Sequence, residues 1–410
     1  MKPTAELFKA YLKCPTKCWL LSQGAIGEGN AYADWMKAQN EAFHTVALRR
    51  LQETVPENER VIAPPHNQGD NLKAARWRLA VDIEVSADNA VSRLDSVERV
   101  VSNGRGRPAQ LIPSRVTSRN KLTRDDRLLV AFDAQVLSEV LGYDVDLGKI
   151  IHGNDHRTLR VHTAGLLGEV RKSIRKLAEL IASGSAPDLV LNRHCGECEF
   201  RDRCRKKALD NDDLSLLGGM TDGERRRLRS KGIFTVTQLS YTFRPRRRPK
   251  KLKDKRDKYQ HSLKALALRE KKLHIVGNPQ FKIDGTPVYL DVEGIPDRDF
   301  YYLIGLRTAN GDASVQYSLW ADSAHQEIQI WSDFLGILSG IASPVLVHYG
   351  SYETTFLKRM CERYGHPPQG SAAANAINSA INVLSFLFAQ VYFPTHSNSL
   401  KEIASFLGFI

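Results

Sequence analysis

The chain lacks the features of a secreted or membrane-spanning protein. No apolar core of signal-peptide length follows Met1, and none of the 410 residues belongs to a run approaching the ~18 apolar residues that a bilayer span needs. These absences predict a cytoplasmic location and no membrane partner. Thiols stay reduced there, so the six cysteines are better explained as metal ligands or free thiols than as disulfides.

A Walker A sequence (G-x-x-x-x-G-K-S/T) is also missing, so any helicase motor would have to come from a partner. Acidic residues are in deficit, with 46 Asp+Glu against 59 Lys+Arg and a net charge of +13. This imbalance predicts an anionic partner, most commonly nucleic acid.

Much of the excess charge lies in residues 244–258, which have two prolines and no apolar periodicity. The segment is therefore either a solvated linker or an arm that contacts phosphates, for which arginine forks are well suited. The candidate nucleic-acid contacts are Arg244, Arg246, Arg247, Arg248, Lys250 and Lys251.

Residues 1–208 have the pattern of an α/β domain. Apolar spacing predicts that residues 5–53 are mostly helical, and alternation predicts a strand at 77–85 paired with 91–101 as a hairpin. A helix at 128–141, a strand at 148–152 and a helix at 164–183 are expected to follow.

Two further regions are expected. Residues 209–285 contain glycine-bearing turns typical of a helix-hairpin-helix unit, in which backbone amides approach a phosphate, although an ordinary helical linker explains the same pattern. Residues 286–410 predict the element order of an RNase-H-like fold, incomplete at its C-terminus: strands at 288–293, 301–306 and 315–319, a helix at 326–338, a strand at 345–347 and a helix at 354–364.

Three cysteines follow a metal-ligand spacing. Cys195, Cys198 and Cys204 form C-x2-C-x5-C, which brings thiolates from consecutive turns to one centre. The fourth ligand is expected to be Cys14, with Cys18 as the nearby alternative. A compact triplet plus one distant cysteine favours an iron–sulfur cluster, while a structural zinc ion and unligated thiols are the other interpretations.

These cysteines, the start Tyr11–Pro15 and the segment Arg93–Asp95 resemble the RecB-like nucleases that carry an AddB-type iron–sulfur cluster, as CRISPR-associated iron–sulfur exonucleases do. The whole chain is similar to RecB-like nucleases that append an RNase-H-like domain, including residues 239–247. The resemblance implies a multidomain α/β protein with a restriction-endonuclease-like domain, a 4Fe-4S clip, a helix-hairpin-helix-like connector and an RNase-H-like exonuclease domain.

The resemblance also implies a PD-(D/E)xK site, in which Asp95 is the first carboxylate and His44 the upstream histidine. The E-x-K half is missing, because residues 110–115 read Gln-Leu-Ile-Pro-Ser-Arg. Without the second carboxylate this centre is expected to bind DNA rather than to hydrolyse it.

A second site is implied in the last region. Asp291 and Glu293 lie at i and i+2, so they share one side of a strand, as in the first motif of DEDD-type 3′–5′ exonucleases. Glu353 matches the next acidic position, and the last would lie beyond Ile410. These residues predict a Mg²⁺- or Mn²⁺-dependent nuclease acting on DNA, or on RNA. The alternative is a catalytically degenerate DNA-binding subunit of a helicase, nuclease or defence complex.

Overall fold

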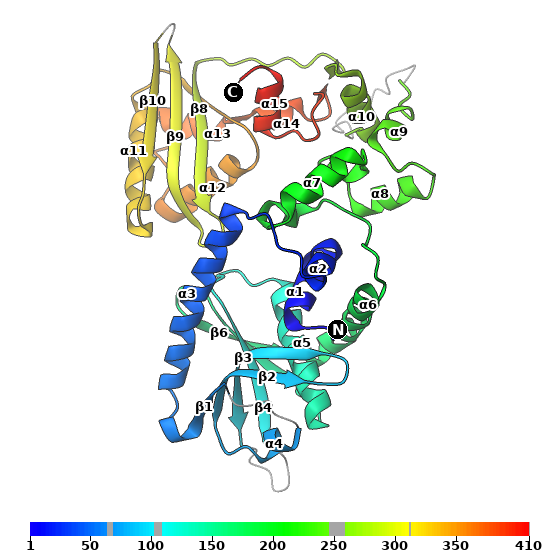
Figure 1. Ribbon diagram of the computed structural model, residues 1–410. Coiled ribbons are helices and arrows are strands. Elements are labelled where there is room, and N and C mark those ends of the chain that lie inside the picture. The colour runs from blue at the N-terminus through cyan, green and yellow to red at the C-terminus, as the bar shows by residue number, and fades with distance from the viewer. Residues whose placement is uncertain (64–68, 102–108, 246–258, 311–312, 410) are drawn as a thin grey trace. The chain divides into compact units, whose positions relative to one another are not determined.

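A computed structural model describes residues 1–63, 69–101, 109–245, 259–310 and 313–409 of the chain. These residues form two compact units, Met1–Ala208 and Leu209–Ile410, each of which combines helices with a mixed sheet (Figure 1). The predicted α/β class is thereby confirmed. In the part of the chain that is described, no helix is both long enough and apolar enough to cross a membrane.

The first unit is built on a six-stranded sheet in the order β1-β2-β3-β4-β5-β6. The pairs β1–β2 and β4–β5 are parallel, and the other neighbours are antiparallel. The predicted hairpin corresponds to β2 and β3. The strands are β1 (Arg60–Ile62), β2 (Leu79–Ser86), β3 (Val91–Val100), β4 (Gln110–Thr117), β5 (Leu147–His152) and β6 (Arg157–His162).

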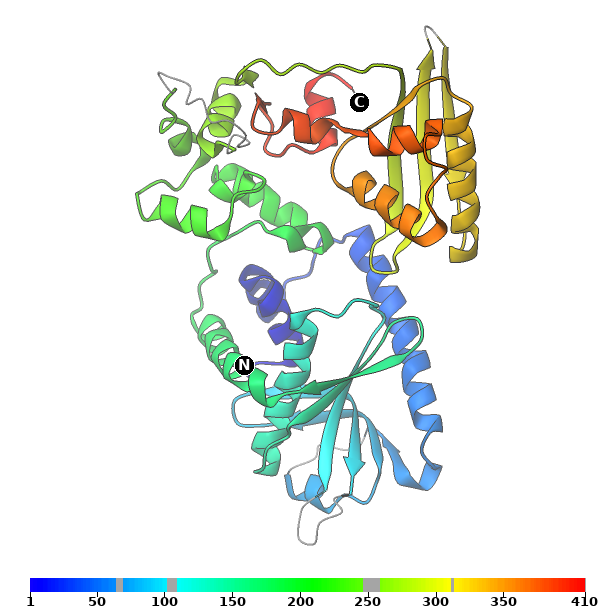
Figure 2. The same ribbon diagram turned by 180° about the vertical axis from the view of Figure 1, so that it is seen from behind.

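Helices cover both faces of this sheet (Figures 1 and 2). Ala47 and Leu48 of α3 pack on Leu79 and Val81, while α5 packs on the other face. The contact between α5 and β5 is so close that a Cβ on Gly148 would lie 2.2 Å from a methyl group of Val130. The helices are α1 (Ala5–Lys13), α2 (Pro15–Ser22), α3 (Ala31–Glu53), α4 (Gly69–Ala74), α5 (Arg124–Leu141), α6 (Leu167–Ala182) and α7 (Arg201–Asp210).

The second unit contains a five-stranded sheet in the order β10-β9-β8-β11-β12. Strands β8, β9 and β10 are antiparallel to one another, and β11 runs parallel to both β8 and β12. Each strand expected in the last region is present. The strands are β8 (Thr286–Ile295), β9 (Phe300–Asn310), β10 (Ala313–Trp320), β11 (Pro344–His348) and β12 (Ile381–Asn382), and a separate pair joins β7 (His274–Ile275) to β13 (Val391–Tyr392).

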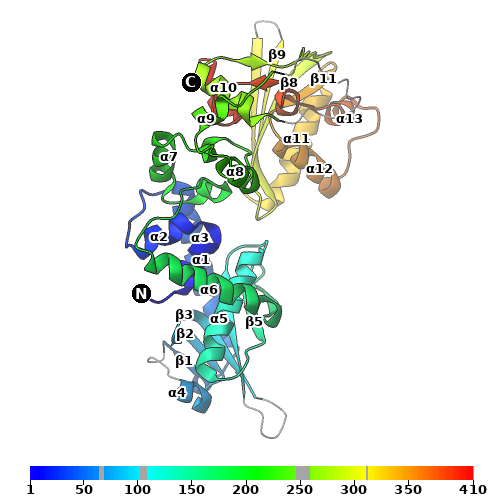
Figure 3. The ribbon, with the colours of Figure 1, turned by 90° about the vertical axis from the view of Figure 1, so that its right-hand side faces the viewer.

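Three helices pack on one face of this sheet, as Figure 3 shows for α11, α12 and α13. The alternation of β8 explains this arrangement, because Val288, Leu290 and Val292 are buried against the helices while the intervening residues are exposed. The helices of the unit are α8 (Asp222–Arg229), α9 (Val236–Ser240), α10 (His261–Glu270), α11 (Glu327–Ser339), α12 (Tyr352–Tyr364), α13 (Ala372–Asn378), α14 (Val383–Leu387) and α15 (Leu400–Phe406).

A buried lysine organises the C-terminal segment of this unit. Lys264 of α10 is 1% exposed, and its ammonium group donates to Phe393 O (2.9 Å), Thr395 Oγ1 (3.2 Å) and Asn398 Oδ1 (3.0 Å). Burial lowers the pKa of Lys264 to about 8. The segment after β13 is therefore held to α10 by polar contacts from a single side chain.

Candidate metal and nuclease sites

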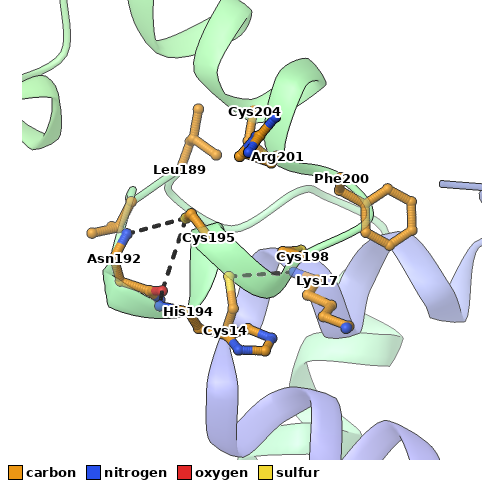
Figure 4. A pocket seen from close by; sticks show the side chains of 11 residues that line it. Cys14, Lys17, Leu189, Asn192, His194, Cys195, Cys198, Phe200, Arg201 and Cys204 are labelled. Atoms are coloured by element: carbon orange, nitrogen blue, oxygen red, sulfur yellow. Dashed lines mark hydrogen bonds between the residues drawn. The ribbon is translucent and has the colours of Figure 1, made fainter. Parts of the chain in front are cut away.

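Four cysteines of the first unit line one pocket (Figure 4). Cys14 lies between α1 and α2, Cys195 and Cys198 lie in the loop before α7, and Cys204 lies on α7. Burial, together with the charges of the other three thiols, raises the pKa of Cys204 to about 11. The four thiols therefore share one pocket, but as they stand they are not arranged as a metal-binding group, since none is found among the described residues.

The alternative ligand, Cys18, lies elsewhere. Its side chain is fully buried in the core of the unit, and it is not among the residues that line the pocket. Burial raises the pKa of Cys18 to about 12. The structure therefore groups Cys14, and not Cys18, with the triplet.

Polar contacts join the two segments that carry the cysteines and hold the cysteine loop in place. The side-chain amide of Asn192 donates to Lys13 O (3.2 Å), and its backbone N–H donates to Cys195 Sγ (3.3 Å). Lys17 forms an ion pair with Glu199 at 2.7 Å. The cysteines are consequently held around the pocket by neighbouring residues.

The first carboxylate centre lies within the β2–β3 ladder. The pairs Val81–Ser96 and Ile83–Leu94 keep one register, and only Asp82 and Asp95, opposite each other between them, are not paired. Asp82, between them, has a φ of +53°, a left-handed conformation that is strained for most residues but tolerated by Asp.

Asp95 is surrounded by cations and donors. His44 Nε2 lies 3.2 Å and Arg115 Nη1 3.7 Å from Asp95 Oδ1, and Val116 N–H donates to Oδ2 at 2.7 Å. Burial opposes ionisation, but these three partners outweigh it and lower the pKa of Asp95. The hydrogen bond to Asp95 raises the pKa of His44. The structure thus brings the two predicted residues together.

Arg115 is the residue of this centre that the sequence analysis missed. Its guanidinium makes two hydrogen bonds of 2.6 Å to Asp133 of α5, which is fully buried. It also donates to Ser92 Oγ at 3.2 Å. A fixed guanidinium therefore neutralises carboxylates where a divalent ion would be needed for hydrolysis. The sequence signal was the basic residue that ends the stretch 110–115.

The second centre lies at the end of two parallel strands. Asp291 and Glu293 are exposed on one side of β8, and Val347 of β11 is paired with Tyr289. The chain leaving β11 enters α12, which carries Glu353 in its first turn. Parallel neighbours end at the same edge of a sheet, so all three predicted carboxylates belong to one end of it.

Glu353 is buried, with a side chain that is 7% exposed. Its Oε2 has no hydrogen-bond partner in the described structure, and His348 Nδ1 lies 3.6 Å away. Buried carboxylate oxygens are costly unless they are paired or bind a cation. The three carboxylates do not converge as they stand, because no group of three His, Cys, Asp or Glu side chains among the described residues is arranged to hold a metal ion.

Tyr352 was not predicted as part of this centre. Burial raises its pKa to about 12, and the charges of Glu293 and Glu353 add to the effect. The tyrosine therefore lies near both carboxylates. It also lines, with Tyr301 and Arg359, a neighbouring pocket of about 260 Å³.

Most of the candidate nucleic-acid contacts cannot be placed. Arg246, Arg247, Arg248, Lys250 and Lys251 lie outside the described residues. Arg244 is exposed, and its guanidinium donates to Tyr241 O (2.8 Å) and Phe243 O (3.0 Å). The role of the segment in binding stays a prediction.

The comparisons with known proteins bear on the second unit. The model of the RNase_H superfamily matches residues 288–410, which contain the second centre. This match confirms the RNase-H-like part of the prediction. No curated protein matches the sequence. A solved structure described as "Crystal structure of SSO0001" is 11% identical and covers 41% of this chain and 96% of its own, with a TM-score of 0.22. The assignment therefore rests on the family match.

Proposed function

We propose that this protein is a metal-dependent nuclease that hydrolyses phosphodiester bonds of DNA through its second unit. The RNase_H superfamily match over residues 288–410 carries the proposal. It includes Asp291 and Glu293 on β8 and Glu353 at the start of α12. Carboxylate oxygens are the ligands that Mg²⁺ and Mn²⁺ prefer. An ion held there would stabilise charge on the attacking and leaving oxygens of the scissile phosphate.

The buried residues of the centre have a positioning role. His348 is 1% exposed at its side chain and faces Glu353, so it restricts where that carboxylate can point. Glu353 Oε2 makes no hydrogen bond with other described residues and could accept a cation besides its contact with His348. Asp291 and Glu293 remain exposed on the strand, where a nucleic-acid strand can reach them.

The proposal assigns a different role to the first unit. Cys14, Cys195, Cys198 and Cys204 would bind a 4Fe-4S cluster, since four thiols line one pocket together with the apolar Leu189, Val190 and Phe200. The cluster would link the N-terminus of the unit to its C-terminal loop. The Asp95 centre would not cleave, because Arg115 already neutralises it.

Cleavage assays on single-stranded DNA, double-stranded DNA and RNA, with Mg²⁺ or Mn²⁺, test the catalytic proposal. Asp291→Asn and Glu293→Gln should each reduce any cleavage by at least about 100-fold, because loss of a metal ligand leaves transition-state charge uncompensated. Glu362→Gln, an exposed change on α12, is the matched control. Asp95→Ala should leave cleavage largely intact.

A second function is favoured by one observation, namely that the three carboxylates do not converge within the described structure. The protein would then be a DNA-binding subunit of a helicase, nuclease or defence complex. This alternative predicts DNA binding by the full chain without metal-dependent cleavage of any of the three substrates. Cleavage that survives Asp291→Asn but is lost with Asp95→Ala would move the active site to the first unit.

A further inference from the structure

The face of β8, β9 and β10 turned away from helices α11, α12 and α13 carries an unusual set of side chains. The strand register places three rows of residues on it. Starting at the turn that joins β8 to β9, these rows are Glu293–Leu303–Trp320, Asp291–Gly305–Ser318 and Tyr289–Arg307–Gln316. Paired residues of antiparallel strands point to the same side of a sheet. The two exposed carboxylates of the proposed catalytic centre therefore share this face with two large aromatic side chains.

Both aromatic side chains are open to solvent. Trp320 is 61% exposed and Tyr289 is 46% exposed. Tyr302 precedes Leu303 on β9 and therefore belongs to the other face of the strand. Its ring still lies near that of Trp320, the last residue of β10, with a centroid separation of 6.2 Å and an interplanar angle of 23°. An exposed aromatic ring offers a flat face on which a nucleic-acid base can stack.

Arg307 supplies a positive charge on this face. It is exposed and sits beside Tyr289 in the third row. Its guanidinium makes no hydrogen bond or ion pair with other described residues. An arginine without an internal anion is available for an external one, and it suits phosphate oxygens in particular.

Gly305 keeps the middle of this face flat. It is paired with Asp291 on β8 and with Ser318 on β10. A Cβ at this position would meet nothing closer than Asp291 O at 3.5 Å, so internal packing does not require a glycine. Glycine within a strand often marks a place where a ligand approaches the backbone. A larger side chain here would stand beside Asp291 and obstruct access to it.

We propose that this face, defined by Tyr289, Gly305, Arg307 and Trp320, is a stacking platform for single-stranded nucleic acid. The rings would stack on bases and Arg307 would contact the backbone, as on other single-strand binding surfaces. The strand would then pass over Gly305 beside Asp291. The inference rests on the proposed function, because the platform would deliver a strand to its carboxylates. A duplex hides the faces of its bases and would not use the rings.

Binding of the full chain to labelled oligonucleotides in EDTA tests the platform without any cleavage. Trp320→Ala and Tyr289→Ala should each raise the Kd for oligo-dT roughly 5- to 100-fold, the range expected for one lost ring–base contact. The Kd for a duplex of equal length should not change. Val315→Ala is the matched control, because Val315 is 48% exposed on β10 but pairs with Thr308 on the opposite face. The same binding measurement with oligo-rU determines whether the platform also binds RNA.

Gly305→Val provides a second, independent variant. The open space around Gly305 predicts that the protein still folds, which thermal unfolding checks. Single-strand affinity should fall at least tenfold. The platform proposal is overturned if all three variants bind oligo-dT as tightly as the unmodified protein does. It is also overturned if their affinity for the duplex falls by the same factor as their affinity for oligo-dT. A change of oligomeric state with Trp320→Ala at unchanged oligo-dT affinity would assign the face to a protein contact instead. Cleavage by the unmodified protein, measured separately, shows whether the nuclease proposal stands whatever the platform result.

Discussion

Replacing Arg115 by methionine should strongly destabilise the first unit. The guanidinium is 16% exposed and pairs with Asp133, whose side chain is fully buried. Removing it leaves a buried carboxylate without its cation and Ser92 Oγ without a donor. Loss of one partner from a buried ion pair typically costs about 3–5 kcal/mol. That is a large share of the roughly 5–15 kcal/mol that stabilises a domain.

A double variant distinguishes the cost of a buried unpaired charge from the cost of lost packing. Arg115→Met combined with Asp133→Leu removes both charges, and such replacements are often close to neutral. We expect the double variant to recover at least about 2 kcal/mol, although Ser92 remains unsatisfied at a cost of about 1 kcal/mol or more. Arg93→Met is the control on the same sheet. Arg93 is 72% exposed where it pairs with Asp82, so its loss should cost less than about 1 kcal/mol.

Two units in one chain make a single unfolding curve ambiguous. Denaturant titration read by pulsed hydrogen exchange in peptides from β3, β4 and α5 isolates the first unit. A loss below about 1 kcal/mol for Arg115→Met, or a double variant as unstable as the sum of the two single ones, would show that the pair is not the buried cation–carboxylate contact described.

Two further predictions concern other parts of the chain. Anaerobically purified protein should be brown, absorb near 400 nm and contain about four irons; Cys14→Ser should lose them while Cys18→Ala keeps them, and stoichiometric zinc without iron would contradict the cluster. Burial lowers the pKa of Lys264 from its usual value of 10.5 to about 8, so the folded state binds fewer protons than the unfolded state between these values. The free energy of unfolding should therefore rise with pH in that window, by up to about 3 kcal/mol from this group, and Lys264→Met, followed by urea titration at pH 8 and 10, should remove the slope.

Local patterns were enough to predict most elements near the two centres. Alternation identified β2 from residues 77–85, and the i, i+2 spacing of Asp291 and Glu293 predicted two carboxylates on one side of a strand, which the structure finds exposed. Cys14 was grouped with a triplet about 180 residues away, and the structure places all four around one pocket. These features depend on residue spacing along one element, or on a recognisable motif.

Contacts between distant elements could not be read from spacing. The pairing of Arg115 on β4 with Asp133 on α5 depends on how a helix lies across a sheet. The left-handed backbone of Asp82 lies opposite Asp95 of the neighbouring strand, which no spacing along β2 indicates. The platform residues fall on three strands, and only the pairing of β8, β9 and β10 shows that they share a face. In each case the deciding interaction is non-local.

The hydrogen bond that joins Asn192 to Lys13 spans 179 residues, and this separation affects how the protein can fold during synthesis. Ribosomes add roughly 5–20 residues per second. Roughly 10–40 s therefore pass between the synthesis of helix α1 and that of the segment around Asn192, which contacts its C-terminal end. During that interval Cys14 and Cys18 remain reachable by oxidants and by metal ions. The first unit is therefore expected to complete its fold late. Under the proposed iron–sulfur role of the four cysteines, the supply of iron and reductant during translation should influence how much protein reaches the native state.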